Sequence, residues 1–108
     1  MSRAEHGAHA ALAELLLENV LTEARRREIH RRLADIATDP EERAHHLARA
    51  VIEPDRDVSQ ALEDAGLSLV RRGAPDSAAS LLERAVDLTP SGDRLAVRRR
   101  LALAADQQ

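Results

Sequence analysis

Apolar residues recur along most of this chain at the three- and four-residue spacing of a helix face. The first apolar segment covers residues 9–20, and its larger members share one face: Leu12, Leu15, Leu16 and Val20. A second segment covers about residues 23–38, with Thr22 as its N-cap. Its stripe of Ile29, Leu33 and Ile36 is expected to be buried. Residues 1–8 are expected to form a loose start.

Two proline-bounded segments follow. Asp39 caps a third helix with Pro40 in its first position, and Pro54 is expected to end it. Its predicted inner face comprises Ala44, Leu47, Ala48 and Val51. Either Asp55 or Asp57 caps a fourth helix, which runs to about Arg72 and ends at a left-handed Gly73.

The C-terminal third predicts two more helices. The fifth covers about residues 76–88 and must pack antiparallel to the fourth, because the loop of residues 73–75 is short. Either Ser91 or Asp93 begins a sixth, which continues to about Ala105. The pattern therefore predicts about six helices, packed as antiparallel hairpins in one domain over residues 1–108.

Composition supports an all-α fold and limits the chemistry. The 108 residues include no aromatic residue and no Cys, and the apolar residues are mostly Ala and Leu. All sixteen basic residues are Arg, and the formal net charge is −3. An acidic balance argues against a dedicated nucleic-acid binder. The lack of Cys excludes disulfides and thiolate metal sites.

Residues 59–92 carry small and large residues at the spacing of a tetratricopeptide repeat. In the first helix, the positions of the repeat pattern are occupied by Leu62, Ala65, Gly66 and Leu69. In the second helix they are occupied by Ala78, Leu82 and Ala85, and Pro90 ends the repeat. The segment resembles one complete repeat whose aromatic positions are aliphatic. A glycine inside a helix costs about 1 kcal/mol relative to Ala. We therefore expect close approach of Ala78 at Gly66; a tolerated glycine in an ordinary bundle is the alternative.

The flanking helices fit the same frame incompletely. The third helix places Ala44 and Ala48 in repeat-like positions, as in a degenerate unit, and the sixth helix resembles the first half of another unit. The sixth helix is expected to leave apolar surface exposed at Leu95, Val97, Leu101 and Leu103. This indicates either a fragment of a longer chain or self-association, with a homodimer as one outcome.

Three segments together resemble the helical region of large ATP-binding LuxR-type transcriptional regulators, which are multidomain bacterial proteins. They are residues 25–34 (RRREIHRRLA), 39–48 (DPEERAHHLA) and 72–90, and residues 9–20 match only weakly. The resemblance implies a connecting helical scaffold or sensor region. The family's ATPase and helix-turn-helix modules have no counterpart here, and a P-loop needs a Lys that this chain lacks.

Metal chemistry receives little support from the histidines. Glu42 and His45 form one Glu-x-x-His motif, whereas a carboxylate-bridged di-iron bundle needs two such motifs and two further Glu residues. His45 and His46 point about 100° apart on a helix, so they are poorly placed to share a metal. We expect His46 to border the core, with His30 packed near it.

The sequence therefore predicts a non-enzymatic helical module that contacts proteins, with no cofactor or metal. Arg clusters at residues 25–32 and 98–100 support an alternative, a nucleic-acid-binding accessory domain. Interspersed acidic residues and the lack of aromatics favour solvated faces and carboxylate partners for these arginines. A metal-dependent helical bundle is a third hypothesis. No apolar run is long enough to span a bilayer and no secretory signal is evident, so a cytoplasmic location is expected.

Overall fold

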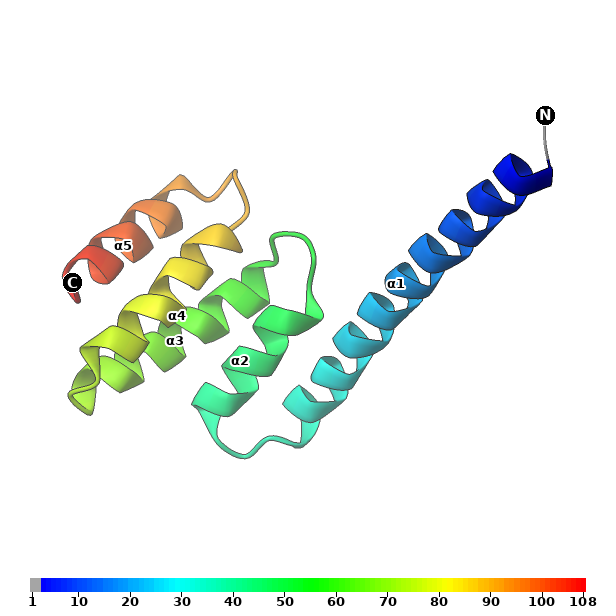
Figure 1. The fold of residues 1–108 in the computed structure, drawn as a ribbon. Helices are drawn as coiled ribbons and strands as arrows, with labels where there is room; N and C mark the ends of the chain where they lie inside the picture. The colour runs from blue at the N-terminus through cyan, green and yellow to red at the C-terminus, as the bar shows by residue number, and fades with distance from the viewer. Residues whose placement is uncertain (1–2) are drawn as a thin grey trace.

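The computed structural model describes residues 3–108, with side chains from His9 onward, and shows an all-α protein. Five helices pack in sequence as antiparallel neighbours, without strands in the described part of the chain (Figure 1). Their bounds are α1 Arg3–Ile36, α2 Pro40–Ala50, α3 Arg56–Arg71, α4 Pro75–Asp87 and α5 Arg94–Ala105. None of the described helices is long and apolar enough to cross a membrane.

Helix α1 is one continuous helix, so the predicted break at Thr22 is wrong, and the expected six helices are five. The Thr22 hydroxyl donates to the Glu18 carbonyl at 2.8 Å instead of capping a new helix. No Gly or Pro interrupts residues 8–37, so nothing stops propagation there. Of residues 1–8, where a loose start is expected, residues 3–8 belong to α1, and residues 1 and 2 lie outside the described part of the chain.

The molecule is elongated because α1 projects from the other helices (Figure 1). The principal extents are 63 × 30 × 24 Å. The radius of gyration is 18.7 Å, against about 13 Å for a compact chain of this length. Only the C-terminal part of α1 packs on α2, with Ala34 buried there.

The face by which α1 meets α2 differs from the predicted stripe. Ile29 and Ile36 are exposed and Leu33 is half-buried, so that stripe is not the contact face. His30 faces α2, where it meets His46, and Ala34 is buried one turn further along α1. Ala44 and Ala48 belong to the core cluster that α2 forms with α3 and α4. The residues of the predicted inner face all meet the core: Leu47 packs against it from α2, and Val51 does so from the position just after the helix.

Helix α2 ends at Ala50, earlier than Pro54, because Val51 is already extended, with φ −113° and ψ 146°. The segment after it is held to the end of α4, where the Asp55 amide donates to the Leu88 carbonyl at 2.9 Å. Asp55, rather than Asp57, then caps α3 by accepting from the Val58 amide at 3.0 Å.

The turn between α3 and α4 follows the prediction. Gly73 has φ 75° and donates to the Val70 carbonyl, while Ala74 donates to the Leu69 carbonyl. These two bonds form a Schellman motif, which needs a left-handed residue at this position. Pro75 then occupies the first turn of α4. At the next junction Asp93, rather than Ser91, caps α5 by accepting from the Ala96 amide.

The α3–α4 hairpin holds the centre of the core. The predicted repeat positions Leu62, Ala65, Gly66, Leu69, Ala78, Leu82 and Ala85 are all buried, and Pro90 is half-buried. A Cβ built on Gly66 would lie 2.8 Å from Leu82 Cγ and 3.6 Å from the Ala78 carbonyl oxygen. The glycine therefore accommodates the Leu82 side chain first, with the Ala78 backbone behind it.

Candidate interaction surface

The N-terminal part of α1 carries six of the eleven large apolar side chains that are exposed in the described chain. We call residues 9–26 the α1 arm; every side chain in it is exposed. Six aliphatic side chains there are between 49% and 62% exposed: Leu12, Leu15, Leu16, Leu17, Val20 and Leu21. Solvent-exposed apolar residues are ordinary singly, but a contiguous group marks an interaction site.

Local sequence explains why the arm is helical and why nothing covers it. Ala, Leu and Glu dominate it, and these residues favour helix. The chain reverses only after Ile36, so α2 returns along the opposite end of α1 and stops at Ala50. Most of the stability of a helix in a protein comes from tertiary packing of its apolar side chains, which the arm lacks. The arm therefore gains most from a neighbour that the described chain does not supply.

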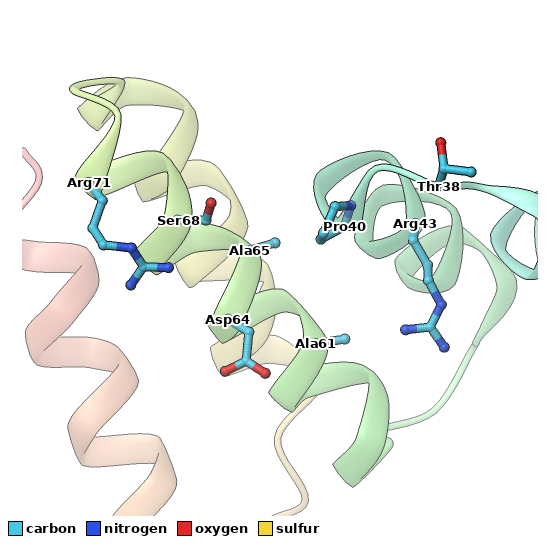
Figure 2. Close-up of a pocket in the computed structure, with 8 residues that line it drawn as sticks. All are labelled: Thr38, Pro40, Arg43, Ala61, Asp64, Ala65, Ser68 and Arg71. Atoms are coloured by element: carbon cyan, nitrogen blue, oxygen red, sulfur yellow. The ribbon is translucent and has the colours of Figure 1, made fainter.

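A groove of about 370 Å³ lies between the start of α2 and one face of α3 (Figure 2). Ala61 and Ala65 supply small side chains, Asp64 and Arg71 extend from α3, and Arg43 extends from α2 on the other side. All buried side-chain polar atoms of the described residues have hydrogen-bond partners. The groove is therefore open and charged at its edges, without an orphaned polar group that points to a ligand.

A second groove, of about 310 Å³, lies where the arm leaves α2, and it is basic. Its lining comprises Glu23, Arg26, Arg27, His30, Ala48, Arg49, Val51 and Arg84. Arg26 pairs with Glu23 at 3.7 Å, and Arg84 lies 3.5 Å from the Ala48 carbonyl and 3.9 Å from Asp87. Part of this positive charge is therefore engaged within the chain.

His30 and His46 meet between α1 and α2, as predicted. Their Nδ1 atoms are 2.9 Å apart and the rings are stacked, with centroids 5.2 Å apart. Burial, together with nearby His46 and Arg49, lowers the pKa of His30. Glu42 lies 3.8 Å from His46. No group of three or more potential metal ligands occurs among the described residues.

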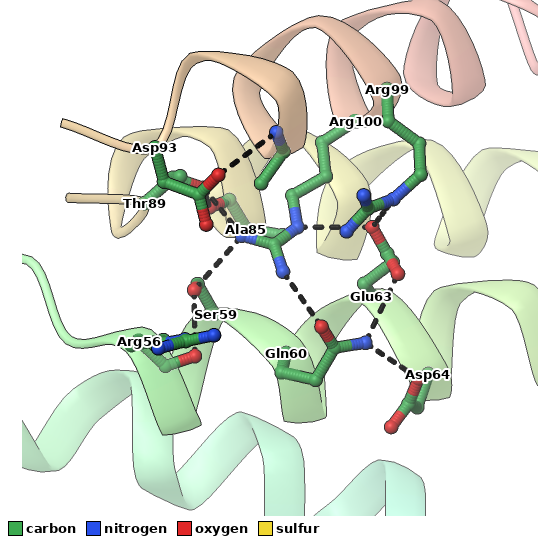
Figure 3. A network of polar contacts seen from close by, with 11 residues as sticks. Arg56, Ser59, Gln60, Glu63, Asp64, Ala85, Thr89, Asp93, Arg99 and Arg100 are labelled. Atoms are coloured by element: carbon green, nitrogen blue, oxygen red, sulfur yellow. Dashed lines mark hydrogen bonds and ion pairs between the residues drawn. The ribbon is translucent and has the colours of Figure 1, made fainter. Parts of the chain in front are cut away.

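The Arg cluster at residues 98–100 is not a uniformly solvated face, because Arg100 is only 2% exposed. Its guanidinium donates to Glu63 Oε1 at 3.0 Å, to Ser59 Oγ at 3.0 Å, to Thr89 Oγ1 at 2.8 Å and to Gln60 Oε1 at 3.1 Å (Figure 3). These bonds join α5 to α3 and to the end of α4. They hold α5 in place as a structural element.

Glu63 is the counter-ion at the centre of this network. Burial alone would raise the pKa of Glu63, but hydrogen bonds from Arg99, Gln60 and Arg100 outweigh it, and the pKa is lowered. Arg99 Nε lies 2.8 Å from Glu63 Oε1 and remains half-exposed. The carboxylate partner expected for this Arg cluster is therefore present. In the other Arg cluster, Arg31 and Arg32 both pair with Glu28.

The sequence carries a signal for the burial of Arg100 that the spacing of large apolar residues alone does not show. Ala96, Arg100 and Ala104 recur every four residues and are the buried residues of α5. Of the residues considered for self-association, Leu95 and Leu101 are exposed, while Val97 and Leu103 flank the buried row and are half-buried. Leu95 and Leu101 lie about 120° apart around the helix, so they do not share a face.

Comparison with known proteins adds no assignment: no family model, curated protein or solved structure matches this chain.

Proposed function

We propose that this chain is a non-enzymatic helical scaffold that binds protein partners, helix against helix, through the α1 arm. The observation that carries the proposal is the run of six exposed aliphatic side chains on residues 12–21. A helix in a protein is stabilised mainly by burial of its apolar side chains. A helix–helix contact supplies that burial without a preformed pocket.

The rest of the molecule supports this role. Helices α2 to α5 stack in order, and the Arg100–Glu63 contact fixes the last helix on α3. This gives the arm a stable base from which it projects. We extend the proposal to a tetratricopeptide-like array of the kind found in the helical region of LuxR-type regulators. Residues 25–34, 39–48 and 72–90 resemble that region. Protein contacts within or between chains are the function such a region implies.

Photo-crosslinking in cells that produce the protein tests the proposal. A photoreactive amino acid replaces Leu17 in one variant and Ala11 in a matched control, about 120° away around the arm. We expect covalent protein adducts from position 17 well above those from position 11. A second substitution, Val20→Glu, should remove them. Equal, background-level adducts at both positions would contradict a binding role for the arm.

The basic groove favours a second candidate, a nucleic-acid-binding accessory role. Four arginines line it: Arg26, Arg27, Arg49 and Arg84. The lack of aromatic residues and the net charge of −3 weigh against this role. Fluorescence anisotropy with labelled DNA duplexes distinguishes the two: salt-sensitive binding at physiological ionic strength, reduced by Arg27→Ala, would support the accessory role.

A further inference from the structure

The arm carries a repeating stripe that suits one specific neighbour. Ala13, Leu17, Val20 and Ala24 are spaced by four, three and four residues, and we call them the pairing stripe. All four are exposed, and this spacing is the one by which two helices pack side by side. We propose that the partner of the arm is a second copy of this chain, with the two arms paired antiparallel. This inference rests on the proposed function, which makes the arm a helix-binding surface.

The apolar area of the arm fits a modest homodimer. Each exposed Leu or Val side chain corresponds to roughly 100 Å² of apolar surface at about 25 cal/mol per Å². Leu16, Leu17, Val20 and Leu21 lie on the pairing stripe or within about 70° of it around the helix, whereas Leu12 and Leu15 point away from it. Those four side chains give roughly 400 Å² per copy, or about 800 Å² for a pair. That total is below the range of stable specific interfaces, so we expect a weak dimer, with a dissociation constant on the order of a hundred micromolar.

Charge decides the orientation of the pair. The arm is acidic before residue 24, with Glu14, Glu18 and Glu23 and no Arg among the residues from His9, and it is basic after residue 24, with Arg25 and Arg26. A parallel pair would place the acidic part of one arm level with the acidic part of the other, and the two basic parts level with each other. An antiparallel pair places the acidic part of one arm beside the basic part of the other.

The register follows from the pairing stripe. In an antiparallel pair, Leu17 packs opposite Val20 of the second copy, and Ala13 opposite its Ala24. Glu14 and Arg25 each follow one of these alanines in sequence, so they lie along the same edge of the stripe. The two side chains therefore meet across the interface, and symmetry produces this ion pair twice. The small alanines allow close approach at both ends of the stripe.

Sedimentation of the full chain over a wide concentration range tests the self-association. We expect a reversible monomer–dimer equilibrium that Leu17→Glu weakens at least a hundredfold. Leu95→Glu on α5 is the matched control and should leave association unchanged. Because the arm has no packing role in the core, the thermal unfolding of the Leu17→Glu monomer should remain cooperative. A strict monomer at high micromolar concentration, or dissociation by Leu95→Glu instead, would overturn the inference.

Disulfide trapping tests the orientation, since the chain has no cysteine of its own. Single variants Ala13→Cys and Ala24→Cys are mixed and mildly oxidised. Antiparallel arms bring residue 13 of one copy to residue 24 of the other, so only the mixed disulfide should form. Parallel arms separate these positions by about 16 Å, beyond disulfide reach, and give only homodisulfides. Predominant homodisulfides would overturn the antiparallel arrangement.

Charge exchange tests the register independently. Glu14→Arg alone and Arg25→Glu alone should each weaken dimerisation about tenfold, because two attractive pairs become repulsive. The double variant should restore association to within a few-fold of the original. If the double variant is as weak as the two single variants combined, Glu14 and Arg25 do not face each other.

The two proposals fail in different ways. Adducts at position 17 that contain only other proteins, together with a monomer in sedimentation, overturn self-pairing and leave the proposed function standing. Background-level adducts at position 17 contradict the proposed function. Adducts at position 17 with the mass of two chains support both.

Discussion

The α1 arm and the α3–α5 block are built from similar residues but differ in what those residues contact. In the block, Leu62 and Leu82 are fully buried, and even the charged Arg100 lies in the interior. In the arm, every leucine is about half exposed. The difference comes from chain reversal: the short turn at Gly73 returns α4 onto α3, whereas no turn returns the chain onto the arm. A helical apolar pattern therefore indicates that a face needs a packing partner, but it does not identify which element or molecule that partner is.

The first prediction concerns the buried charge that distinguishes the block. Glu63→Ala removes the carboxylate that neutralises Arg100 and should lower the free energy of unfolding by about 3–5 kcal/mol, because an uncompensated buried charge is strongly destabilising. Urea denaturation measures the change. Arg99→Ala is the control: Arg99 is half-exposed, so its loss should cost no more than about 1 kcal/mol.

The reverse substitution sharpens this prediction. Arg100→Met leaves Glu63 with its bonds from Arg99 and Gln60, while Ser59 and Thr89 keep their own backbone acceptors. Its cost should therefore be at most about 1–2 kcal/mol. Equal costs for Glu63→Ala and Arg100→Met would show that the network does not depend on charge compensation.

The second prediction compares the same substitution in the two regions. Leu62→Ala opens a cavity in the hairpin core and should cost about 2–5 kcal/mol. Leu16→Ala in the arm removes a side chain that is 58% exposed and should change the stability of the dilute chain by less than about 0.5 kcal/mol. Urea denaturation at a concentration well below the dimerisation range provides the measurement. A large loss from Leu16→Ala there would mean that the arm is already packed within one chain.

The third prediction concerns the close contact within the hairpin. Gly66→Ala should gain up to about 1 kcal/mol of helix propensity. The new Cβ would lie 2.8 Å from Leu82 Cγ, however, and overpacking of this kind costs about 1–3 kcal/mol. We expect a net loss of about 1–2 kcal/mol. In a Leu82→Ala background the contact is absent, so the same substitution should become neutral or stabilising; additive effects would contradict the contact.

Local signals predicted the block well and the arm poorly. Asp55, Gly73 and Asp93 act through bonds to residues within five positions, so their roles could be read from sequence, although Asp57 and Ser91 competed as caps. The break expected at Thr22 failed because a hydroxyl can bond either to a following amide or to a preceding carbonyl, and sequence does not distinguish the two. One helix therefore replaced two, and it carried the apolar face of the first segment away from the core.

The candidate surface could be predicted only in part for a related reason. The spacing of Leu12, Leu15, Leu16 and Val20 predicts one apolar face, but their exposure depends on where α2 ends, which is a long-range property. Charge predicts a solvent-exposed position for Arg100, whereas its burial depends on Glu63, 37 positions earlier. The sequence therefore indicates the residue types of the α1 arm and of the Arg100 network, but it does not indicate which residues contact each other in the fold.

The fourth prediction, with the smallest effect, concerns the joint between the two regions. His30 contacts His46 where α1 meets α2, with Glu42 and Arg49 nearby, and the pKa of His30 is lowered in the folded chain. The unfolded chain therefore binds a proton more readily, so stability should be complete above pH 6.5 and decrease as the pH falls below it. Thermal unfolding between pH 7.5 and 5.5 should show this decrease, and His30→Asn should reduce it. His45→Asn is the control, since His45 is exposed on α2 and should leave the slope unchanged. If the stability of His30→Asn depends on pH as steeply as that of the original chain, the proton uptake belongs to another group. The contact between α1 and α2 would then not be the source of the pH dependence.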